Sequence, residues 1–419
     1  MTSSNDDLSQ SKMATHSRQP VGKLWVVWLL FLFQYLAVGA YFIFLNVYWR
    51  QAGLTGTQIG TLNTTTSIIG VIGSIVWGYL SDKTGKPRLL IAIGAVGSLT
   101  IAQFIPLVHT FGAFFALTVL GSSLSSSLTT LVDGVTLALL GARSENYGRF
   151  RLGGSIGYIL AASISGFIYD KTGLGLIFPV YGVIMGSFAA IALLLPNIPV
   201  KFEQRAKAQL GRMIRQPAWV IFMVSVFLTW IGNYASILYL GVTLLSMGAS
   251  QSIIGLSSTS AALIEIPFMA FSGWFIRKVG LVRLIILAIF LMMTRFVLLG
   301  LMPDPGWAFF INILNGPAYG LFATCIVAYA KAMAPSTLTV TAQGLLNSTI
   351  GLAGVVSAML TGVLFDLIGP KNIFFVMAAF SLVAIISFSL GALRWKISTD
   401  ANNLSDEITD SDHIPEPDL

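Results

Sequence analysis

Charged residues are scarce in this chain. Only 10% of its 419 residues are Asp, Glu, Lys or Arg, and 55% are hydrophobic; a soluble domain carries about a quarter charged residues. Cysteine is scarcer still, because Cys325 is the single one, which excludes a disulfide framework and a zinc site built on cysteines. The sequence also lacks a phosphate-binding loop, a nucleophile elbow and a metal-binding cluster. These absences argue against an enzyme and predict neither a cofactor nor a bound metal.

Long apolar runs are abundant, and the mean hydropathy is +0.81. From Leu24 onward each run has roughly 20 residues or more, which is enough for a helix to cross a ~30 Å hydrocarbon core. The pattern predicts an all-α membrane protein with twelve transmembrane helices in two pseudo-symmetric bundles of six. The predicted spans are 24–49, 56–81, 88–107, 111–139, 150–171, 175–196, 218–247, 252–276, 282–301, 307–333, 340–368 and 372–394.

The polar stretches between and around these runs suggest the domain boundaries. Residues 1–20 and the acidic residues 397–419 are predicted to be disordered cytoplasmic tails. The segment 197–217 is basic and polar, so we expect a cytoplasmic linker there, and its scattered apolar residues favour a short interfacial helix. The linker separates an N-terminal bundle, 21–196, from a C-terminal bundle, 218–396.

Lys and Arg are distributed unevenly between the two ends of the predicted spans. With the N-terminus inside, only Arg50, Lys171 and Lys371 fall in outer loops and Arg295 inside a span, which leaves 20 of the 24 on the cytoplasmic side. The net charge of +7 therefore reflects topology and contact with lipid, not a nucleic-acid partner. We expect a monomer in the lipid bilayer of a bacterial inner membrane, with both termini in the cytoplasm.

A short sequence pattern occurs four times. Its full form has Gly, a charged residue four positions later, Gly at +7 and Arg at +10, and its short form lacks the Arg. The full copies are Gly78/Asp82/Gly85/Arg88 and Gly273/Arg277/Gly280/Arg283, and the short copies are Gly166/Asp170/Gly173 and Gly362/Asp366/Gly369. The two halves of the chain are thus related at offsets of 195 (273 − 78) and 196 (362 − 166).

The full copies are predicted to form a gate. We expect Asp82 and Arg88 to brace the cytoplasmic ends of the bundles in an outward-open state, and Gly85 to permit a tight turn. The gating residues are then Gly78, Asp82, Gly85, Arg88, Arg277 and Gly280.

Three ionisable residues lie well inside predicted spans: Asp133, Glu265 and Arg295. A charge at the bilayer centre costs at least ~2.5–3.5 kcal/mol, so each must face a cavity or a partner. Glu265 lies 12 residues before Arg277 and Arg295 lies 12 residues after Arg283, so both are about 18 Å from the same membrane face. We predict an ion pair or a shared substrate contact between them, and the alternative is a purely structural salt bridge.

Asp133 lies in the fourth span, about three turns from a basic cluster that includes Arg149 and Arg151. Cations at a helix entrance are usually topology anchors, but Arg151 already adjoins an apolar run and could reach inward. We therefore predict that Asp133 pairs with Arg151 in a cavity.

Tyr41, Tyr48 and Trp49 cluster at the outer end of the first span. They form either an aromatic belt or a surface on which a ring stacks. The hydroxyl-rich run from Ser122 to Thr130 in the fourth span serves either helix packing or the lining of a cavity.

The pattern Gly78–Arg88 resembles the loop signature of the major facilitator superfamily, and the resemblance covers nearly the whole chain. Residues 39–42 and 148–151 further resemble the branch of lactose permeases, phenylpropionate permeases and nucleoside:proton symporters. In that branch a helix-four acid, an arginine and an aromatic residue hold the substrate, which implies these roles for Asp133, Arg151 and Tyr158. The resemblance also implies that Glu265 is the helix-eight acid and Arg295 the arginine used in proton coupling.

The sequence departs from the lactose permeases at helix ten. Asn315 and Ala318 replace a His and a Glu, so that proton site is absent, although Asn315 remains a candidate substrate contact. Glu265, with Arg295 as its partner, or Asp133 must then carry any proton.

Three functions remain open from the sequence. The first is proton-coupled uptake of a sugar or glycoside, a nucleoside or an aromatic acid by alternating access, with the proton gradient as the energy source. The second is an exporter of drugs or metabolites, and the three buried charges argue against its greasier cavity. The third is a membrane sensor or scaffold, which would need a folded soluble domain that the short polar tails do not provide.

Overall fold

The computed structural model describes residues 24–126, 128–140, 147–196, 216–334 and 338–394. Within these residues all the regular structure is helical, and twelve helical stretches are long and apolar enough to cross a membrane. This confirms the predicted all-α fold and the number of spans. The predictions for the two tails, and for the linker apart from residues 216 and 217, lie outside the described residues.

The first six spans contain three interruptions. A π-helical turn (Val38–Phe42) divides the first span, a turn at Ser126 ends the first helix of the fourth, and a 3-10 turn (Ile105–Leu107) ends the third. The helices are α2 (Leu24–Ala37), α3 (Ile43–Gln51), α4 (Gly56–Thr84), α5 (Pro87–Phe104), α6 (Phe111–Ser125), α7 (Leu128–Leu140), α8 (Tyr147–Thr172) and α9 (Ile177–Ala192).

The last six spans are also interrupted. The eighth, which contains Pro267, ends at Ala270, and a short amphipathic helix follows it. The helices are α11 (Pro217–Ser246), α12 (Gln251–Ala270), α13 (Ser272–Val279), α14 (Leu281–Leu301), α15 (Trp307–Ile313), α16 (Asn315–Met333), α17 (Thr339–Ile368) and α18 (Asn372–Arg394).

The last glycine of each repeated pattern ends or follows a helix in a backbone conformation with positive φ. The φ angles of Gly85, Gly173, Gly280 and Gly369 are 62°, 81°, 88° and 89°. Glycine adopts positive φ without the steric cost that a Cβ brings. This confirms that Gly85 permits a tight turn, and it gives a physical reason for the same residue in all four copies.

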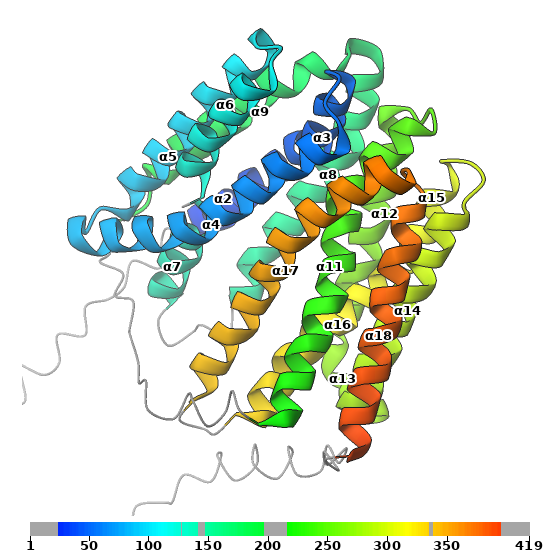
Figure 1. Ribbon diagram of the computed structural model, residues 1–419. Helices are drawn as coiled ribbons and strands as arrows, with labels where there is room; N and C mark the ends of the chain where they lie inside the picture. Colours follow the sequence, from blue (N-terminus) through cyan, green and yellow to red (C-terminus); the bar gives the residue numbers. More distant parts are fainter. Residues whose placement is uncertain (1–23, 127, 141–146, 197–215, 335–337, 395–419) are drawn as a thin grey trace, which may run out of the picture.

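The two bundles are in hydrogen-bond contact at one end only. Helices α4 and α17 meet there and then diverge, as Figure 1 shows. Among the described residues, the hydrogen bonds between bundles all lie within the stretches 46–64, 158–170, 238–259 and 355–366. We call the end that holds Thr55, Asp170, Ser250 and Asp366 the joined end. The other end, with Asp82, Arg88 and Arg277, is the separated end.

Two carboxylates hold the joined end together, each bonding the first turn of a helix in the opposite bundle. Asp366 on α17 accepts hydrogen bonds from the backbone N–H groups of Gly56 and Thr57 on α4, both at 2.7 Å. Asp170 on α8 accepts bonds from the N–H groups of Gln251 and Ser252 on α12, at 2.5 and 3.0 Å. The hydroxyls of Thr57 and Ser252 donate to the same carboxylates. Both acids are the charged residue of a short repeat copy.

Glycines let the two bundles approach closely at this end. A Cβ at Gly362 would lie 2.5 Å from the carbonyl oxygen of Gly56, and one at Gly60 would lie 2.6 Å from that of Ala358. The hydroxyl of Tyr239 donates to the carbonyl of Gly56 at 2.9 Å. The joined end is therefore closed by backbone contact.

Candidate functional site

The predicted pair Asp133 and Arg151 is linked through a tyrosine that the sequence analysis did not single out. Tyr147, at the start of α8, donates its hydroxyl to Asp133 on α7 at 2.8 Å. Arg151 lies one turn further along α8 and interacts electrostatically with Tyr147 and with Asp133. Its guanidinium also lies over the ring of Tyr35 on α2, 5.3 Å from the ring centre. Asp133, Tyr147, Arg151 and Tyr35 thus form one polar group on the N-terminal bundle.

Glu265 on α12 faces this group from the C-terminal bundle. The carboxyl is half-buried, and Arg151 is the charged residue that interacts with it electrostatically. Arg151 also interacts electrostatically with Asp133, so one cation interacts with two carboxylates that belong to opposite bundles. We call Asp133, Tyr147, Arg151, Tyr35 and Glu265 the central cluster.

Tyr158 lies two turns beyond Arg151 on α8 and also meets the opposite bundle. Its hydroxyl interacts with Ser258 on α12 and, electrostatically, with Glu265. The aromatic residue implied by the family resemblance therefore lies beside the central cluster.

Tyr319 of the C-terminal bundle lies near the cluster, and two more aromatic rings of that bundle adjoin it. Trp230 and Tyr234 lie on α11 and Tyr319 lies on α16; the ring of Trp230 is 5.4 Å from that of Tyr234 and 5.7 Å from that of Tyr319. Tyr319 interacts electrostatically with Glu265, Arg151 and Tyr35, so its hydroxyl faces the central cluster. Such rings offer flat surfaces against which the apolar face of a ring-shaped solute can pack.

The structure does not bring Arg295 to Glu265. Arg295 is only 4% exposed and lies inside the C-terminal bundle. Its guanidinium donates to Asn312 Oδ1 at 2.8 and 2.9 Å and to the hydroxyl of Ser236 at 2.7 Å. Equal depth did not determine which way the two side chains point, because Glu265 faces the N-terminal bundle and Arg295 faces its own. The predicted pairing is therefore wrong for this conformation.

Tyr41 lies away from the central cluster, whereas Asn315 lies one turn before Tyr319 on α16. Tyr41 is 5% exposed inside the N-terminal bundle, where its ring stacks on that of Tyr181 at 4.2 Å. It lines a small internal cavity of about 70 Å³ and does not lie between the bundles. Asn315, at the start of α16, is half-buried, and its Oδ1 atom has no hydrogen-bond partner.

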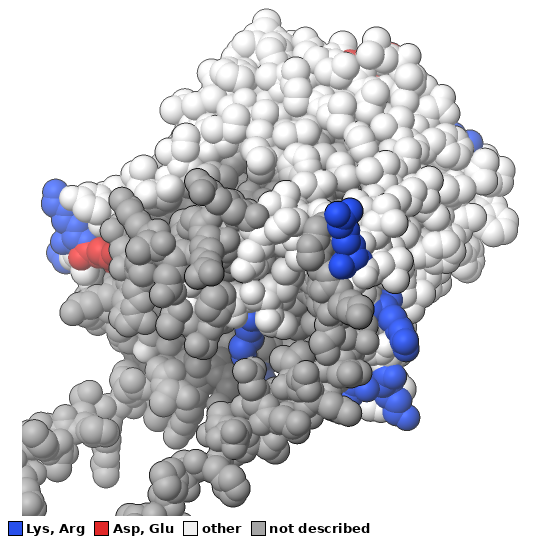
Figure 2. Space-filling model, turned by 60° about the horizontal axis from the view of Figure 1, so that its bottom comes forward, with Lys and Arg blue, Asp and Glu red and all other residues white. Residues whose placement is uncertain are grey.

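The gating residues lie apart from one another at the separated end. Arg88 donates to the carbonyl oxygen of Leu195, within its own bundle, at 3.5 Å. Asp82 and Arg277 are exposed, and no hydrogen bond joins either of them to the opposite bundle within the described residues. Figure 2 views this end and shows basic side chains gathered around it. The same part of the chain contains no cluster of His, Cys, Asp and Glu that could hold a metal.

Sequence reasoning missed Tyr35, Trp230, Tyr234 and Tyr319. The spacing of Trp230 and Tyr234, one turn apart on a predicted helix, would have placed them on one face. A further signal is Gly354 on α17, where a Cβ would lie 3.2 Å from the ring of Tyr234. Neither signal shows from sequence alone that the face meets the opposite bundle.

Known proteins resemble this chain over most of its length. The maltose permease of Geobacillus stearothermophilus is 27% identical over 371 residues, which cover 87% of this chain and 94% of the permease. A putative nucleoside transporter of Escherichia coli, YegT, is 22% identical over 361 residues, or 82% of each chain. The crystal structure of the nucleoside transporter NupG shares the fold, with a TM-score of 0.78 and 16% identity over 88% of this chain and 99% of that one.

Residues 24–376 match the MFS_1 like family. The match covers eleven complete spans and the beginning of the twelfth. Together with the twelve spans in two joined bundles, it identifies the chain as a member of the MFS_1 like family, an integral membrane solute transporter of the major facilitator superfamily that works by alternating access.

Proposed function

We propose that this transporter takes up a small neutral solute that carries hydroxyl groups on a ring, such as a sugar, glycoside or nucleoside, together with protons. The observation that carries the proposal is that Arg151 interacts electrostatically with both Asp133 and Glu265, which belong to opposite bundles. A guanidinium donates hydrogen bonds to hydroxyl groups, and a carboxylate accepts hydrogen bonds from them. Charges of both signs can therefore hold several hydroxyl groups of one solute. Trp230, Tyr234 and Tyr319 supply the apolar surface for the ring.

An aromatic acid fits this site less well than a neutral ring. Its carboxylate would find one cation, Arg151, but two carboxylates beside it, and like charges in a partly desolvated site repel one another. The printed names of two relatives, a maltose permease and a putative nucleoside transporter, agree with a neutral hydroxylated substrate.

Coupling rests on the different positions of the two carboxylates. Asp133 moves with Arg151 because both belong to the N-terminal bundle, whereas Glu265 belongs to the other bundle. When the bundles rock, the distance from Arg151 to Glu265 changes and the distance to Asp133 does not. A buried carboxylate that loses its cationic neighbour favours the protonated form. Protonation of Glu265 would therefore follow the conformation, and Arg295 would serve as a buried structural residue.

We assign the separated end to the cytoplasm, because the positive-inside rule places its Lys and Arg residues there. The conformation described above is then inward-open. Both termini are cytoplasmic in this orientation, the bundles 21–196 and 218–396 are the rocking units, and the transporter works as a monomer without a nucleic-acid partner.

Binding to the central cluster can be tested in purified protein. We expect Asp133→Asn and Arg151→Ala to weaken substrate binding at least tenfold, because each removes a charged hydrogen-bond partner worth about 1.5–3 kcal/mol. The measurement is thermal stabilisation across a panel of maltose, other glycosides, nucleosides and phenylpropionate. Asp304→Asn, which alters an exposed loop acid, is the control. Unchanged binding in both cluster variants would remove the site assignment.

Coupling can be tested separately in proteoliposomes. We expect Glu265→Gln to abolish accumulation against a gradient while counterflow exchange continues, because exchange needs no net proton movement. A Gln variant that still concentrates the substrate would show that Glu265 is not the proton carrier. The direction of transport in oriented vesicles distinguishes uptake from the export of a drug or metabolite.

A further inference from the structure

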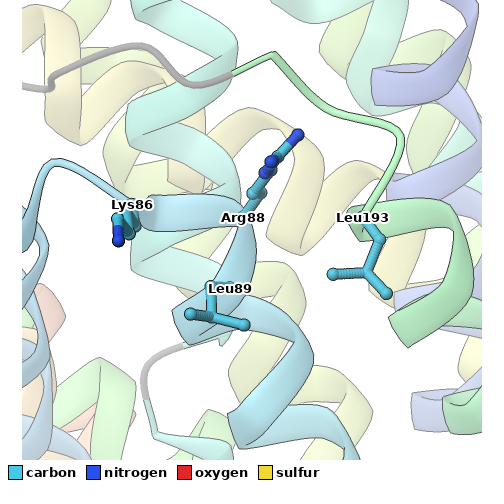
Figure 3. Close-up of a pocket in the computed structure, with 4 residues that line it drawn as sticks. All are labelled: Lys86, Arg88, Leu89 and Leu193. Atoms are coloured by element: carbon cyan, nitrogen blue, oxygen red, sulfur yellow. The ribbon is translucent and has the colours of Figure 1, made fainter.

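A cavity of about 350 Å³ lies at the separated end, away from the central cluster. It is lined by Lys86 and Arg88, which begin α5, by Leu89 on the same helix, and by Leu193 just after α9. In Figure 3 the two leucines lie across the space from one another, and Arg88 extends toward the chain that follows α9. The cavity therefore lies between the third and sixth spans, where both reach the membrane surface.

The two cations of this cavity have most of their hydrogen-bonding capacity unused. Lys86 is exposed, and Arg88 makes one long bond, to the carbonyl of Leu195 at 3.5 Å. A guanidinium has five N–H donors and an ammonium has three. Within the described residues neither cation forms an ion pair with a carboxylate. Two neighbouring cations with no carboxylate partner in the part of the chain that the structure describes form a site for an anionic group.

The leucines indicate where that anion comes from. Leu89 is 44% exposed and lies in the first turn of a membrane-spanning helix, and Leu193 is 49% exposed and directly follows another. Exposed leucines at this depth face acyl chains, whereas a free phosphate would gain nothing from them. Basic pockets between transmembrane helices are known to take the headgroups of anionic phospholipids.

We propose that this cavity binds an anionic glycerophospholipid, with its phosphate against Lys86 and Arg88 and an acyl chain along Leu89 and Leu193. The proposal needs only that the chain spans a membrane and is independent of substrate and coupling. Because Arg88 is also a gating residue, a bound lipid occupies the side chain that would otherwise be available to brace the separated end.

The chain supplies a matched control for this site. Arg283 is the counterpart of Arg88 in the second full copy of the repeat, at the same distance from its glycine, and it does not line the cavity. Arg283→Ala removes the same charge at the corresponding depth of the other bundle. General electrostatic attraction to an anionic membrane would be lowered equally by both substitutions.

The test is lipid binding to the delipidated full-length protein in detergent, followed by native mass spectrometry and thermal stability. Phosphatidylglycerol, phosphatidylcholine and inorganic phosphate are titrated separately. We expect saturable binding of phosphatidylglycerol that falls at least tenfold in the double variant Lys86→Ala/Arg88→Ala and stays within twofold in Arg283→Ala. Phosphatidylcholine and inorganic phosphate should give no stabilisation at the same concentrations.

Three results would overturn the proposal. The first is binding of phosphatidylglycerol by the double variant as strong as that of the wild type. The second is a loss of phosphatidylglycerol binding in Arg283→Ala equal to the loss in the double variant. The third is stabilisation by inorganic phosphate that matches stabilisation by the lipid, which would identify a site for a free anion. If the double variant folds poorly, the single variant Lys86→Gln tests the proposal, because this exposed side chain can be changed without disturbing packing. Binding of phosphatidylglycerol to Lys86→Gln must then be at least threefold weaker than to the wild type.

Discussion

The two ends of the molecule carry copies of the same sequence pattern in opposite states. At the joined end Asp170 and Asp366 each bond the first turn of a helix in the opposite bundle, and the glycines four residues before them lie against that bundle. At the separated end Asp82 and Arg277 hold the same positions in the pattern and reach no partner in the opposite bundle within the described residues. One pattern is therefore engaged at one end and disengaged at the other.

This difference shows what the repeat does. A carboxylate at the end of one helix accepts bonds from the free backbone N–H groups that begin another, which satisfies donors that a helix start leaves unpaired. Asp366 ends α17 and bonds the start of α4, so inversion of the arrangement would bring Asp82, near the end of α4, to the start of α17. Arg277 cannot act in this way because a guanidinium accepts no hydrogen bond. The separated end thus has one such carboxylate where the joined end has two, and it should close less firmly.

The largest effect on this comparison should come from forcing the joined end apart. In Gly60→Val with Gly362→Val, each new side chain would meet backbone of the opposite bundle. Overpacking costs about 1–3 kcal/mol per site, so the equilibrium should move roughly a hundredfold toward an open joined end. Spin labels at Gln51→Cys and Asp304→Cys report the distance, because the native Cys325 is buried and does not compete.

The control for the glycine variants lies on the same two helices. Gly70 and Gly344 have no atom within 4 Å of the position where a Cβ would be added. Gly70→Val with Gly344→Val should leave the label distance unchanged. Equal shifts in the two double variants would mean that close backbone contact does not hold the joined end.

Removal of the two carboxylates should have a smaller effect in the same direction. Asp170→Ala with Asp366→Ala deletes three hydrogen bonds from each side of the joined end. Both acids are exposed to solvent. Screening therefore limits the free energy by which each carboxylate stabilises the joined end to about 1 kcal/mol. We expect roughly a thirtyfold rise in the open joined end, with the single variants intermediate. A double variant with the wild-type distance distribution would contradict the assigned role.

The smallest effect, with the opposite sign, should come from Asp82→Asn. The side chain makes no bond to the opposite bundle in the present conformation, so its loss should disfavour only the state in which the separated end closes. Labels at Lys83→Cys and Lys278→Cys, both exposed, should show a fall of about two- to threefold in the closed fraction of that end. A rise in this fraction would refute the symmetry argument.

The sequence was sufficient to predict the twelve spans, their division into two halves and the tight turn at Gly85, because hydrophobic length and positive φ are local properties. It also identified Asp133, Glu265 and Arg295 as charged residues that need a cavity or a partner inside the membrane, whereas Tyr158 followed only from the family resemblance. It could not predict which way Glu265 and Arg295 point, because depth follows from residue number whereas direction follows from how neighbouring helices pack. The cross-bundle bonds of Asp170 and Asp366 were missed for the same reason, although the repeat had already marked both residues.

The most direct test of alternating access is to follow both ends in the same reconstituted protein. One sample carries labels at Gln51 and Asp304 on the joined end, and the other carries them at Lys83 and Lys278 on the separated end. When the transported solute identified by the thermal panel and a proton gradient are supplied, the joined-end distance should lengthen in the same fraction of molecules in which the separated-end distance shortens. Distances that lengthen together, or that stay fixed while transport proceeds, would contradict the account.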